Sequence, residues 1–509
     1  MKTTTNVIAL FTIICASATM HGADGTFTNA VGGSWDERSN WDSGIVADGN
    51  GSVATLRAEL SADATVTLAN ATTNTIGSLY AVNSGNAARK WTVSGTDAAL
   101  RFDKGELDES VVNVAAGTVL ELTGIDDAND VVKTGPGTLR LAPAADGAFQ
   151  ANSLVIREGT NYFTNLSYHY AKVTLDSSDG RNPVLQVCNL EQKWNGLKVS
   201  VPAGTGSPVF IQEANGKLYT HTFELERMLE VNIPASSANF GQMSGTGGFR
   251  KTGAGTLVFG ATPTFNGAIV ISEGSVSCGS SLWDANAQIA VTFGDEGSGN
   301  AALGWGFSDK GTLPGTNVSF HVTQYGGATS FYWSKSVKGQ TCSSNFQLDR
   351  GITFNANINS GCGNTFAGIF SGAGGITFTG TGNDRFFVLA GTNTYAGGTS
   401  INSVAVKVDC ESALGTGDVS VGSTGIISYN AKLGSAINDK AKLRLATGAV
   451  IDFGSYEVSE KVGALYFDGI RQSNGVWGAI GSRCDHETSF IAGAGVIRVG
   501  GPGLSVFIR

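Results

Sequence analysis

The feature that most constrains this chain is a short internal repeat. The heptapeptide KTGPGTL at 133–139 returns as KTGAGTL at 251–257. The likeness continues downstream, because IREGT at 156–160 corresponds to ISEGS at 271–275. A repeat of this length describes one supersecondary unit, which buries its apolar face only by stacking on its neighbours. We therefore expect a repeat architecture and not a globular domain.

A third, looser copy lies further along the chain. It begins with SGAGG at 371–375, which parallels SGTGG at 244–248, and it reaches GTNTYAGGT at 391–399. The three predicted repeats span 131–160, 244–276 and 371–408.

These residues resemble the autotransporter-associated β-strand repeat, in which a K-T-G-x-G-T-L strand is followed by N-x-Y-x-G-G-T and a further strand. The match is close in the two Lys-Thr-Gly copies and partial in the third, where the Lys and the Thr-Leu are replaced and residues 383–385 are inserted. The stretches around Trp35 and Trp41 and from 462 to 496 also look like the flanks of such proteins. The resemblance implies a right-handed parallel β-helix outside the cell, and it says little about activity.

Side-chain alternation predicts the same fold on physical grounds. In TLRL at 138–141 and ITFT at 376–379, alternate residues are suited to one buried face, and such strands bury that face only when rungs stack. The predicted class is all-β, a parallel β-helix (β-solenoid) with short capping segments. Rungs of roughly 20 to 25 residues, about 4.8 Å apart, give a body on the order of 100 Å long.

The residues around each Lys-Thr-Gly turn are given structural roles. Glycine adopts positive φ without strain, so these glycines are interpreted as turn residues and not as a phosphate-binding loop. The lysines that precede them are predicted to be solvated corner residues and not ligands for anything. The residues concerned are Gly135, Gly137, Gly253, Gly255, Lys133 and Lys251.

Composition favours a folded chain and argues against nucleic-acid binding. Glycine provides 71 of 509 residues and only 15% of residues are charged, which favours many short strands joined by tight turns. The formal net charge is -9, and no basic patch stands out to neutralise phosphates. Predicted partners are glycans, neutral or cationic cell-surface components, or other copies of the chain.

The N-terminus predicts export. The apolar run at 7–18 is too short to span a bilayer but has the length of a signal-peptide core. Cleavage is expected after the Ala-Ser-Ala at 16–18 or near Ala23; Ile14 before Cys15 argues against a lipoprotein anchor. The alternative is a buried N-terminal strand. No other apolar run approaches the ~20 residues of a membrane helix, so a secreted or cell-surface location is expected.

The predicted domains are a signal peptide at 1–23, a capping segment at 24–50, a solenoid at 51–499 and a strand or sorting tail at 500–509. Because repeat-like sequence runs almost to residue 509, we expect no membrane barrel of the kind that autotransporters carry. Trp35 and Trp41 either cap the open core or stack on a sugar ring. Three aromatic residues within 281–370 are expected on a lateral loop: Trp305, Phe331 and Trp333.

No catalytic, cofactor-binding or metal-binding residue is predicted. The mature histidines are scattered, and the H-E-x-x-H, G-x-S-x-G and G-x-x-x-x-G-K-[ST] motifs do not occur. Acidic residues at 126–130 and 295–296 are either calcium ligands or solvated loop carboxylates. The histidines concerned are His169, His221, His321 and His486.

Two functions follow from different classes of protein. The first is a non-catalytic structural or adhesive surface solenoid, in which no single His, Asp or Glu is essential. The alternative is an extracellular polysaccharide lyase or hydrolase, which rests on fold analogy alone. Carboxylates gathered with Arg or Lys on one face favour the enzyme, and smooth faces of Thr, Ser and Asn favour adhesion.

Six cysteines follow the signal segment, and one pair is close to a rung apart. Cys342 and Cys362 are separated by roughly one rung of the chain, and rungs about 4.8 Å apart suit the Cα separation of a disulfide. The expectation is a disulfide that stabilises the fold by about 3 kcal/mol; the alternative is two stacked free thiols. The others are Cys188, Cys278, Cys410 and Cys484.

Overall fold

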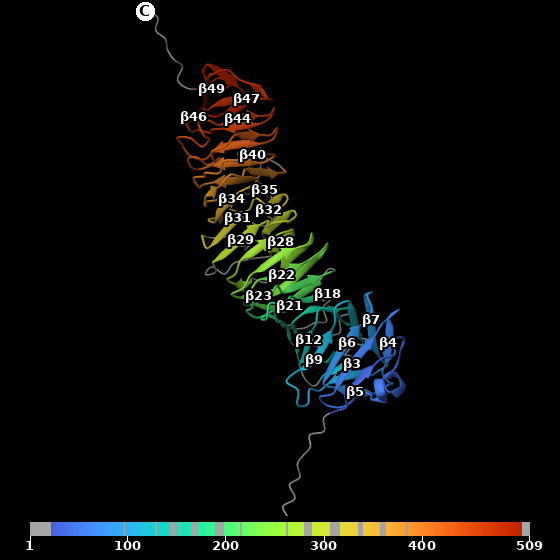
Figure 1. Cartoon of the computed structure of the whole chain (residues 1–509). Coiled ribbons are helices and arrows are strands. Elements are labelled where there is room, and N and C mark those ends of the chain that lie inside the picture. Colours follow the sequence, from blue (N-terminus) through green and yellow to red (C-terminus); the bar gives the residue numbers. More distant parts are fainter. Residues whose placement is uncertain are drawn as a thin grey trace, which may run out of the picture.

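The structure is a computed structural model in which the chain forms one elongated body with its two ends far apart (Figure 1). Strands lie across the long axis from the blue N-terminal rungs to the red C-terminal rungs. Within the described residues, no helix is long and apolar enough to cross a membrane. The structure describes residues 22–500 except 96, 128–129, 143–148, 151–152, 165–171, 189–197, 214–215, 261–262, 279–287, 306–315, 334–338, 357–362 and 382–384.

The main sheet runs the length of the described chain and contains 22 strands. Each strand pairs in parallel with the strand of the next rung, and the final pair, β47 and β48, is antiparallel. Its strands are β1 (Gly25–Phe27), β3 (Val53–Ala58), β6 (Ser78–Asn83), β9 (Ser110–Val114), β12 (Val131–Thr134), β15 (Ser153–Ile156), β17 (Lys172–Leu175), β19 (Lys198–Val201), β21 (Gly216–Leu225), β23 (Ser237–Gly245), β25 (Thr256–Phe259), β26 (Thr264–Phe265), β28 (Gly274–Cys278), β30 (Ala301–Trp305), β32 (Thr329–Trp333), β35 (Ile352–Ala356), β38 (Ile376–Gly380), β40 (Thr399–Asn402), β42 (Val419–Val421), β44 (Lys442–Leu445), β47 (Ala464–Phe467) and β48 (Ile470–Arg471).

The second sheet covers another face of the solenoid and contains 15 parallel strands among the described residues. It receives the chain after a corner, as when β12 is followed by β13. Its strands are β2 (Gly32–Ser34), β4 (Ala64–Thr67), β7 (Arg89–Ser94), β10 (Thr118–Leu122), β13 (Thr138–Leu141), β16 (Gly159–Phe163), β18 (Pro183–Val187), β20 (Val209–Gln212), β22 (Leu229–Asn232), β24 (Phe249–Thr252), β27 (Ile269–Ile271), β29 (Ile289–Phe293), β31 (Val318–Val322), β34 (Asn345–Leu348) and β37 (Phe370–Ser371).

Smaller sheets complete the two ends of the solenoid. The N-terminal rungs have a third face of β5 (Thr73–Ile76), β8 (Ala99–Phe102), β11 (Ile125–Asp127) and β14 (Phe149–Gln150), and two 3-10 helices, η1 (Arg38–Asn40) and η2 (Asp42–Gly44), precede it. The C-terminal rungs have β33 (Thr341–Cys342), β36 (Gly363–Phe366), β39 (Phe386–Leu389), β41 (Ala405–Val408), β43 (Ile426–Tyr429), β45 (Val450–Asp452) and β51 (Ile491–Ala492), closed by β46 (Ser459–Val462), β49 (Gly475–Ala479), β50 (His486–Thr488) and β52 (Val496–Val499).

Strand register shows the length of a rung. Val131 of β12 lies beside Leu154 of β15, and Ile352 of β35 lies beside Ile376 of β38. Both steps along the chain agree with the length expected of one rung. The prediction of an all-β parallel solenoid is therefore confirmed. Some rungs are longer than predicted, as where Leu79 of β6 pairs with Val112 of β9.

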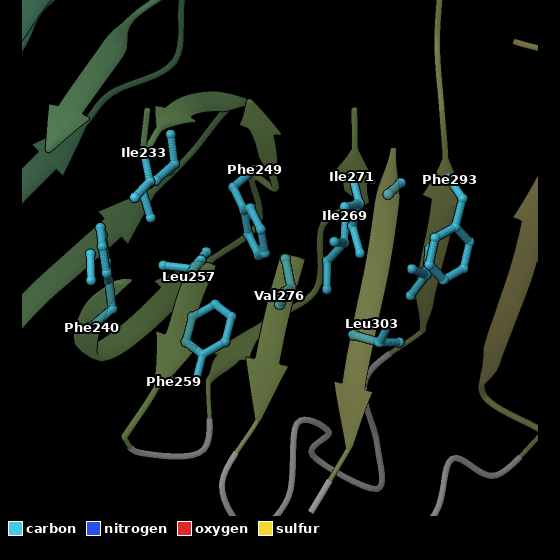
Figure 2. Packing of buried hydrophobic residues seen from close by; sticks show 14 of the residues in the cluster. Ile233, Phe240, Phe249, Leu257, Phe259, Ile269, Ile271, Val276, Phe293 and Leu303 are labelled. Carbon is cyan, nitrogen blue, oxygen red and sulfur yellow. The ribbon is translucent and has the colours of Figure 1, made fainter. Parts of the chain in front are cut away.

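The interior is filled by the alternate residues that the sequence pattern indicates. In β25, Leu257 and Phe259 are buried while Thr256 and Val258 are partly exposed. Side chains from successive rungs, including Phe249, point into the same interior (Figure 2). Burying one such apolar side chain stabilises the fold by about 1.5–3 kcal/mol, so stacking supplies the cover that a lone rung lacks.

Phenylalanine columns run through the C-terminal half of the core. Phe346 of the second sheet stacks on Phe320 and Phe370, with ring centroids 4.5 and 4.6 Å away. On the main sheet, Phe331 and Phe354 have centroids 5.7 Å apart. Phe331 is fully buried, so its expected place on a lateral loop is wrong. Trp305 and Trp333 end β30 and β32, and their side chains lie outside the described ones.

Register also decides the cysteine prediction. Cys342 is a buried free thiol, and its partner in the next rung is Phe366. Because Cys342 is a free thiol, the expected disulfide between Cys342 and Cys362 is wrong; Cys362 itself lies outside the described residues. Burial raises the pKa of the Cys342 thiol to about 11.

Candidate functional site

The lysine of the first repeat is buried, which corrects the prediction of a solvated corner. Lys133 is fully buried at the end of β12. Its Nζ donates to the carbonyl oxygens of Thr134, Gly135 and Glu158 at 2.8, 2.7 and 3.0 Å. All three ammonium protons have an acceptor, and Glu158 lies just before β16 of the next rung. The lysine thus holds its own turn against the following rung.

The second repeat reproduces this arrangement at another corner. Lys251 is fully buried at the end of β24, and its Nζ donates to Thr252, Gly253 and Glu273 carbonyls at 2.7, 2.6 and 3.3 Å. Burial lowers the pKa of Lys133 to about 7 and of Lys251 to about 8. At the first copy the chain turns from the main sheet to the second sheet, and at the second copy it turns from the second sheet back to the main sheet. The motif therefore specifies a corner of the solenoid and not a particular sheet.

The glycines after each lysine are turn residues, as the sequence indicates. Gly135 and Gly253 have φ of +77° and +74°. A Cβ at Gly137 or Gly255 would lie 2.3 Å from a backbone oxygen of the neighbouring turn, so these positions require glycine for close stacking. A ligand is not needed to explain any of the four.

The N-terminal tryptophans form a cap and not a sugar platform. Trp35 is fully buried and Trp41 is 3% exposed. Their rings meet edge to face at 4.9 Å, and Trp41 also contacts Phe27 at 5.4 Å. The indole nitrogens donate to the carbonyls of Ala47 and Trp35. Both rings therefore pack inside the core and are not exposed to a sugar.

The histidines remain apart within the described chain. His221 is 2% exposed, and burial lowers its pKa to about 4. His321 Nε2 lies 2.7 Å from Asp349 Oδ2, a partly exposed pair. His486 stacks on Trp477 at 4.4 Å in the C-terminal cap. His169 lies outside the described residues.

One surface cluster combines carboxylates with an arginine. Arg157 binds both carboxylate oxygens of Glu109 at 2.6 Å and reaches Asp176 at 3.3 Å. The Arg157 guanidinium lowers the pKa of Glu109, and hydrogen bonds from Ser178 and Arg157 outweigh burial to lower the pKa of Asp176. Both carboxylates are held ionised, which suits ion pairing and not proton donation.

The acidic loops show no metal arrangement where they are described. Asp295 pairs with Arg250 at 2.7 Å, and the side chains of residues 126–129 lie outside the described ones. Among described residues, no group of three His, Cys, Asp or Glu side chains is placed to hold a metal ion. Calcium at these loops therefore stays an untested expectation.

A groove along the C-terminal half of the main sheet is the principal candidate site. It encloses about 690 Å³ and follows the solenoid axis where the chain enters β32, β35, β38, β40 and β42. Asp349 and Arg350 line it toward one end and Asp418 toward the other. Its floor includes turn glycines such as Gly374, where a Cβ would lie 2.1 Å from the Arg350 carbonyl oxygen; rung stacking alone requires glycine there.

Hydroxyl side chains distinguish this groove. Thr353, Thr377, Ser400 and Ser420 line it and occupy the same register position in four successive rungs. All four are partly exposed. Strand spacing places the first about 14 Å from the last. We call this row, with Asp349 and Asp418 at its ends, the hydroxyl groove. Sequence alternation marked Thr377 as one face of a strand, but only the register aligns the four.

Two further motif residues have structural roles that the sequence did not reveal. Asn393 is buried; it accepts from the Phe370 amide and donates to the Ala413 carbonyl, so it links three rungs. Tyr395 is fully buried, and its hydroxyl lies 2.5 Å from Thr399 Oγ1. The N-x-Y-x-G-G-T motif thus holds rungs together.

The C-terminal cap contains a buried carboxylate. Glu460 is fully buried and accepts hydrogen bonds from the Tyr429 hydroxyl at 2.5 Å and the amides of Ala436 and Ile437 at 2.9 and 3.2 Å. Burial raises its pKa. The group is enclosed by its own partners, so it organises the cap and is inaccessible to a substrate.

Comparison with known proteins identifies the repeats. Two segments, 249–277 and 387–403, match a family model described as the passenger-associated-transport-repeat. The first contains the second Lys-Thr-Gly copy, and the second contains the N-x-Y-x-G-G-T of the third copy. The resemblance to passenger-type repeats is therefore confirmed for these segments. No curated protein and no solved structure matches the chain.

Proposed function

We propose that the chain is an exported passenger-type surface protein whose solenoid adheres to glycans or other surface components without catalysing a reaction. The observation that carries this proposal is the hydroxyl groove, a row of partly exposed Thr and Ser side chains on a solenoid that contains passenger-type repeats. A rigid array of this kind presents many weak polar contacts in a fixed geometry, which suits binding to a repetitive surface.

The enzymatic alternative draws on surface clusters of carboxylates with an arginine. Arg157 lies between Glu109 and Asp176 in one of them, and Arg250 lies between Glu230 and Asp295 in another. Glycosidases need a carboxylic acid whose pKa is raised so that it can protonate the leaving group. Here Arg157 occupies both carboxylates and keeps them ionised. Among the described carboxylates, Glu460 has a raised pKa, and it is buried in the cap. The described groups therefore favour binding over cleavage.

The test measures attachment and turnover with the same protein. The purified mature chain, immobilised on beads, is offered to a panel of neutral and acidic polysaccharides and to intact cells, and released products are measured by mass spectrometry. We expect attachment with unchanged polysaccharides. Product release that disappears in Glu109→Gln or Asp176→Asn would overturn the proposal and establish the enzyme.

A further inference from the structure

The hydroxyl groove combines four features that together specify a ligand. It extends over several successive rungs, its central side chains are hydroxyls, the charges at its ends are of both signs, and its floor is closely stacked backbone. We infer that the groove binds one neutral oligosaccharide chain lying along the solenoid axis. This inference rests on the proposed adhesive function and names its ligand class and site.

The central hydroxyls are available to a ligand. Within the described part of the chain, the side chains of Thr353 and Thr377 make no hydrogen bond. The hydroxyls of Ser400 and Ser420 lie 3.0 Å from each other, and Ser420 Oγ also donates to the Thr399 carbonyl at 3.5 Å, so both serines keep acceptor capacity for a ligand. A hydroxyl both donates and accepts, so a row of them matches a ligand that is itself rich in hydroxyls.

Charge argues for a neutral ligand. Asp349 and Asp418 line the two ends, and Arg350 lies beside Asp349. Arg444 lies 3.0 Å from Asp418 and partly neutralises it. This balance offers no positive surface for a uronic-acid polymer or a nucleic acid, both of which need cations to neutralise their charge.

Backbone pairing argues against an extended peptide. Peptides that bind along a sheet usually add a strand to an open edge. The strands beneath the groove are paired on both sides; β38, for example, lies between β35 and β40. No backbone edge is therefore available at this face, and recognition must come from side chains and turns.

The N-terminal end of the groove is held rigid before any ligand arrives. Arg350 donates through Nε to the Tyr325 carbonyl at 2.8 Å and through Nη1 to the Gly327 carbonyl. Asp349 is fixed by His321 at 2.7 Å. A preformed site loses little conformational entropy on binding, which suits a modest affinity built from hydroxyl contacts.

The experiment uses the purified mature chain and linear oligosaccharides as probes. Xylo-, manno-, cello- and chito-oligosaccharides are titrated calorimetrically, with oligogalacturonate as the acidic probe. The double variant Thr353→Val and Thr377→Val removes two hydroxyls while keeping the shape, and Thr377→Trp fills the groove. Thr174→Val, at a partly exposed main-sheet position in β17, is the matched control.

We expect at least one neutral oligosaccharide to bind, with affinity reduced tenfold or more in both groove variants and unchanged in Thr174→Val; circular dichroism verifies that each variant is folded. No binding of any neutral probe, equal binding by the groove variants, or binding of oligogalacturonate alone would overturn the inference. If the groove variants still attach to cells, the adhesive function stands and the groove is not its site.

Discussion

Replacement of Lys251 by methionine tests whether the repeat lysine stabilises the stacked turns. Methionine keeps the length and the apolar stem but removes the ammonium group. The carbonyls of Thr252, Gly253 and Glu273 then lose the donor that lies 2.7, 2.6 and 3.3 Å away. Two of these belong to the turn itself and the third to the next rung, so the change acts on their junction.

The expected cost follows from two opposing effects. A hydrogen bond from a charged donor contributes about 1.5–3 kcal/mol, and a carbonyl left buried without a partner costs about 1–3 kcal/mol. Against this, methionine removes the cost of burying a charge, which lowers the lysine pKa to about 8. Because the three hydrogen bonds are partly buried, water replaces the ammonium group only incompletely, so the loss prevails and we expect a destabilisation of about 3 kcal/mol at this junction.

Amide hydrogen exchange is the suitable assay, because stability in a solenoid is a sum of neighbour interactions and is lost locally. Peptides covering 249–277 should exchange about 100-fold faster in Lys251→Met, since every 1.4 kcal/mol is tenfold. The exposed Lys172 of β17 supplies the control, and Lys172→Met should leave exchange unchanged. Equal exchange in wild type and Lys251→Met would refute the role given to the lysine.

The same lysine fixes the sign of a pH effect. Its pKa is about 8 in the folded chain and about 10.4 when unfolded. Between these values the unfolded chain binds more protons, so the contribution of Lys251 to stability rises as pH rises from 8 toward 10. The stability difference between wild type and Lys251→Met should therefore grow over this range. A difference that shrinks would show that the folded pKa of Lys251 is not lowered.

Three further predictions concern other parts of the fold. Arg157 holds the pKa of Glu109 below its ordinary value, so the contribution of this pair to stability is fully present above about pH 4 and is lost as pH falls through the lowered pKa. Glu109→Gln should cost about 1 kcal/mol at pH 7 and progressively less as pH falls below about 4, measured by urea unfolding. Phe346→Ala should cost about 3–5 kcal/mol, measured by exchange in 320–370, whereas Val31→Ala at an 83% exposed position should change nothing. Cys342 should resist iodoacetamide until the chain is unfolded, because its thiol is buried and has a raised pKa. The partly exposed Cys484 should react in the native chain and serves as the control. Labelling of Cys342 in the native chain would contradict its place in the core.

The fold was predictable because its signal is local and repeated. Alternation in TLRL at 138–141 and the repeated Lys-Thr-Gly turn each describe one strand and one corner, and both recur. The lysine was misassigned because residue type was given more weight than position. In β24 the buried residues are Phe249 and Lys251, so strict alternation already directed this lysine inward. The carbonyls that satisfy it come from a tight turn and the next rung, which residue type does not reveal.

Strand register explains why the sequence alone did not reveal the hydroxyl groove. The next-rung partner of Thr353 is Thr377, and the partner of Ser400 is Ser420, which is a shorter step along the chain. Since rung length varies, no fixed sequence period aligns these hydroxyls. For the same reason, the sequence spacing of Cys342 and Cys362 did not predict which residues pair. The side chains of the repeat motifs, by contrast, form hydrogen bonds that hold the rungs together: Lys251 donates to backbone carbonyls, and Asn393 links neighbouring rungs. The proposed ligand specificity therefore rests on outward positions that the repeat leaves unspecified, which is where the hydroxyl groove lies.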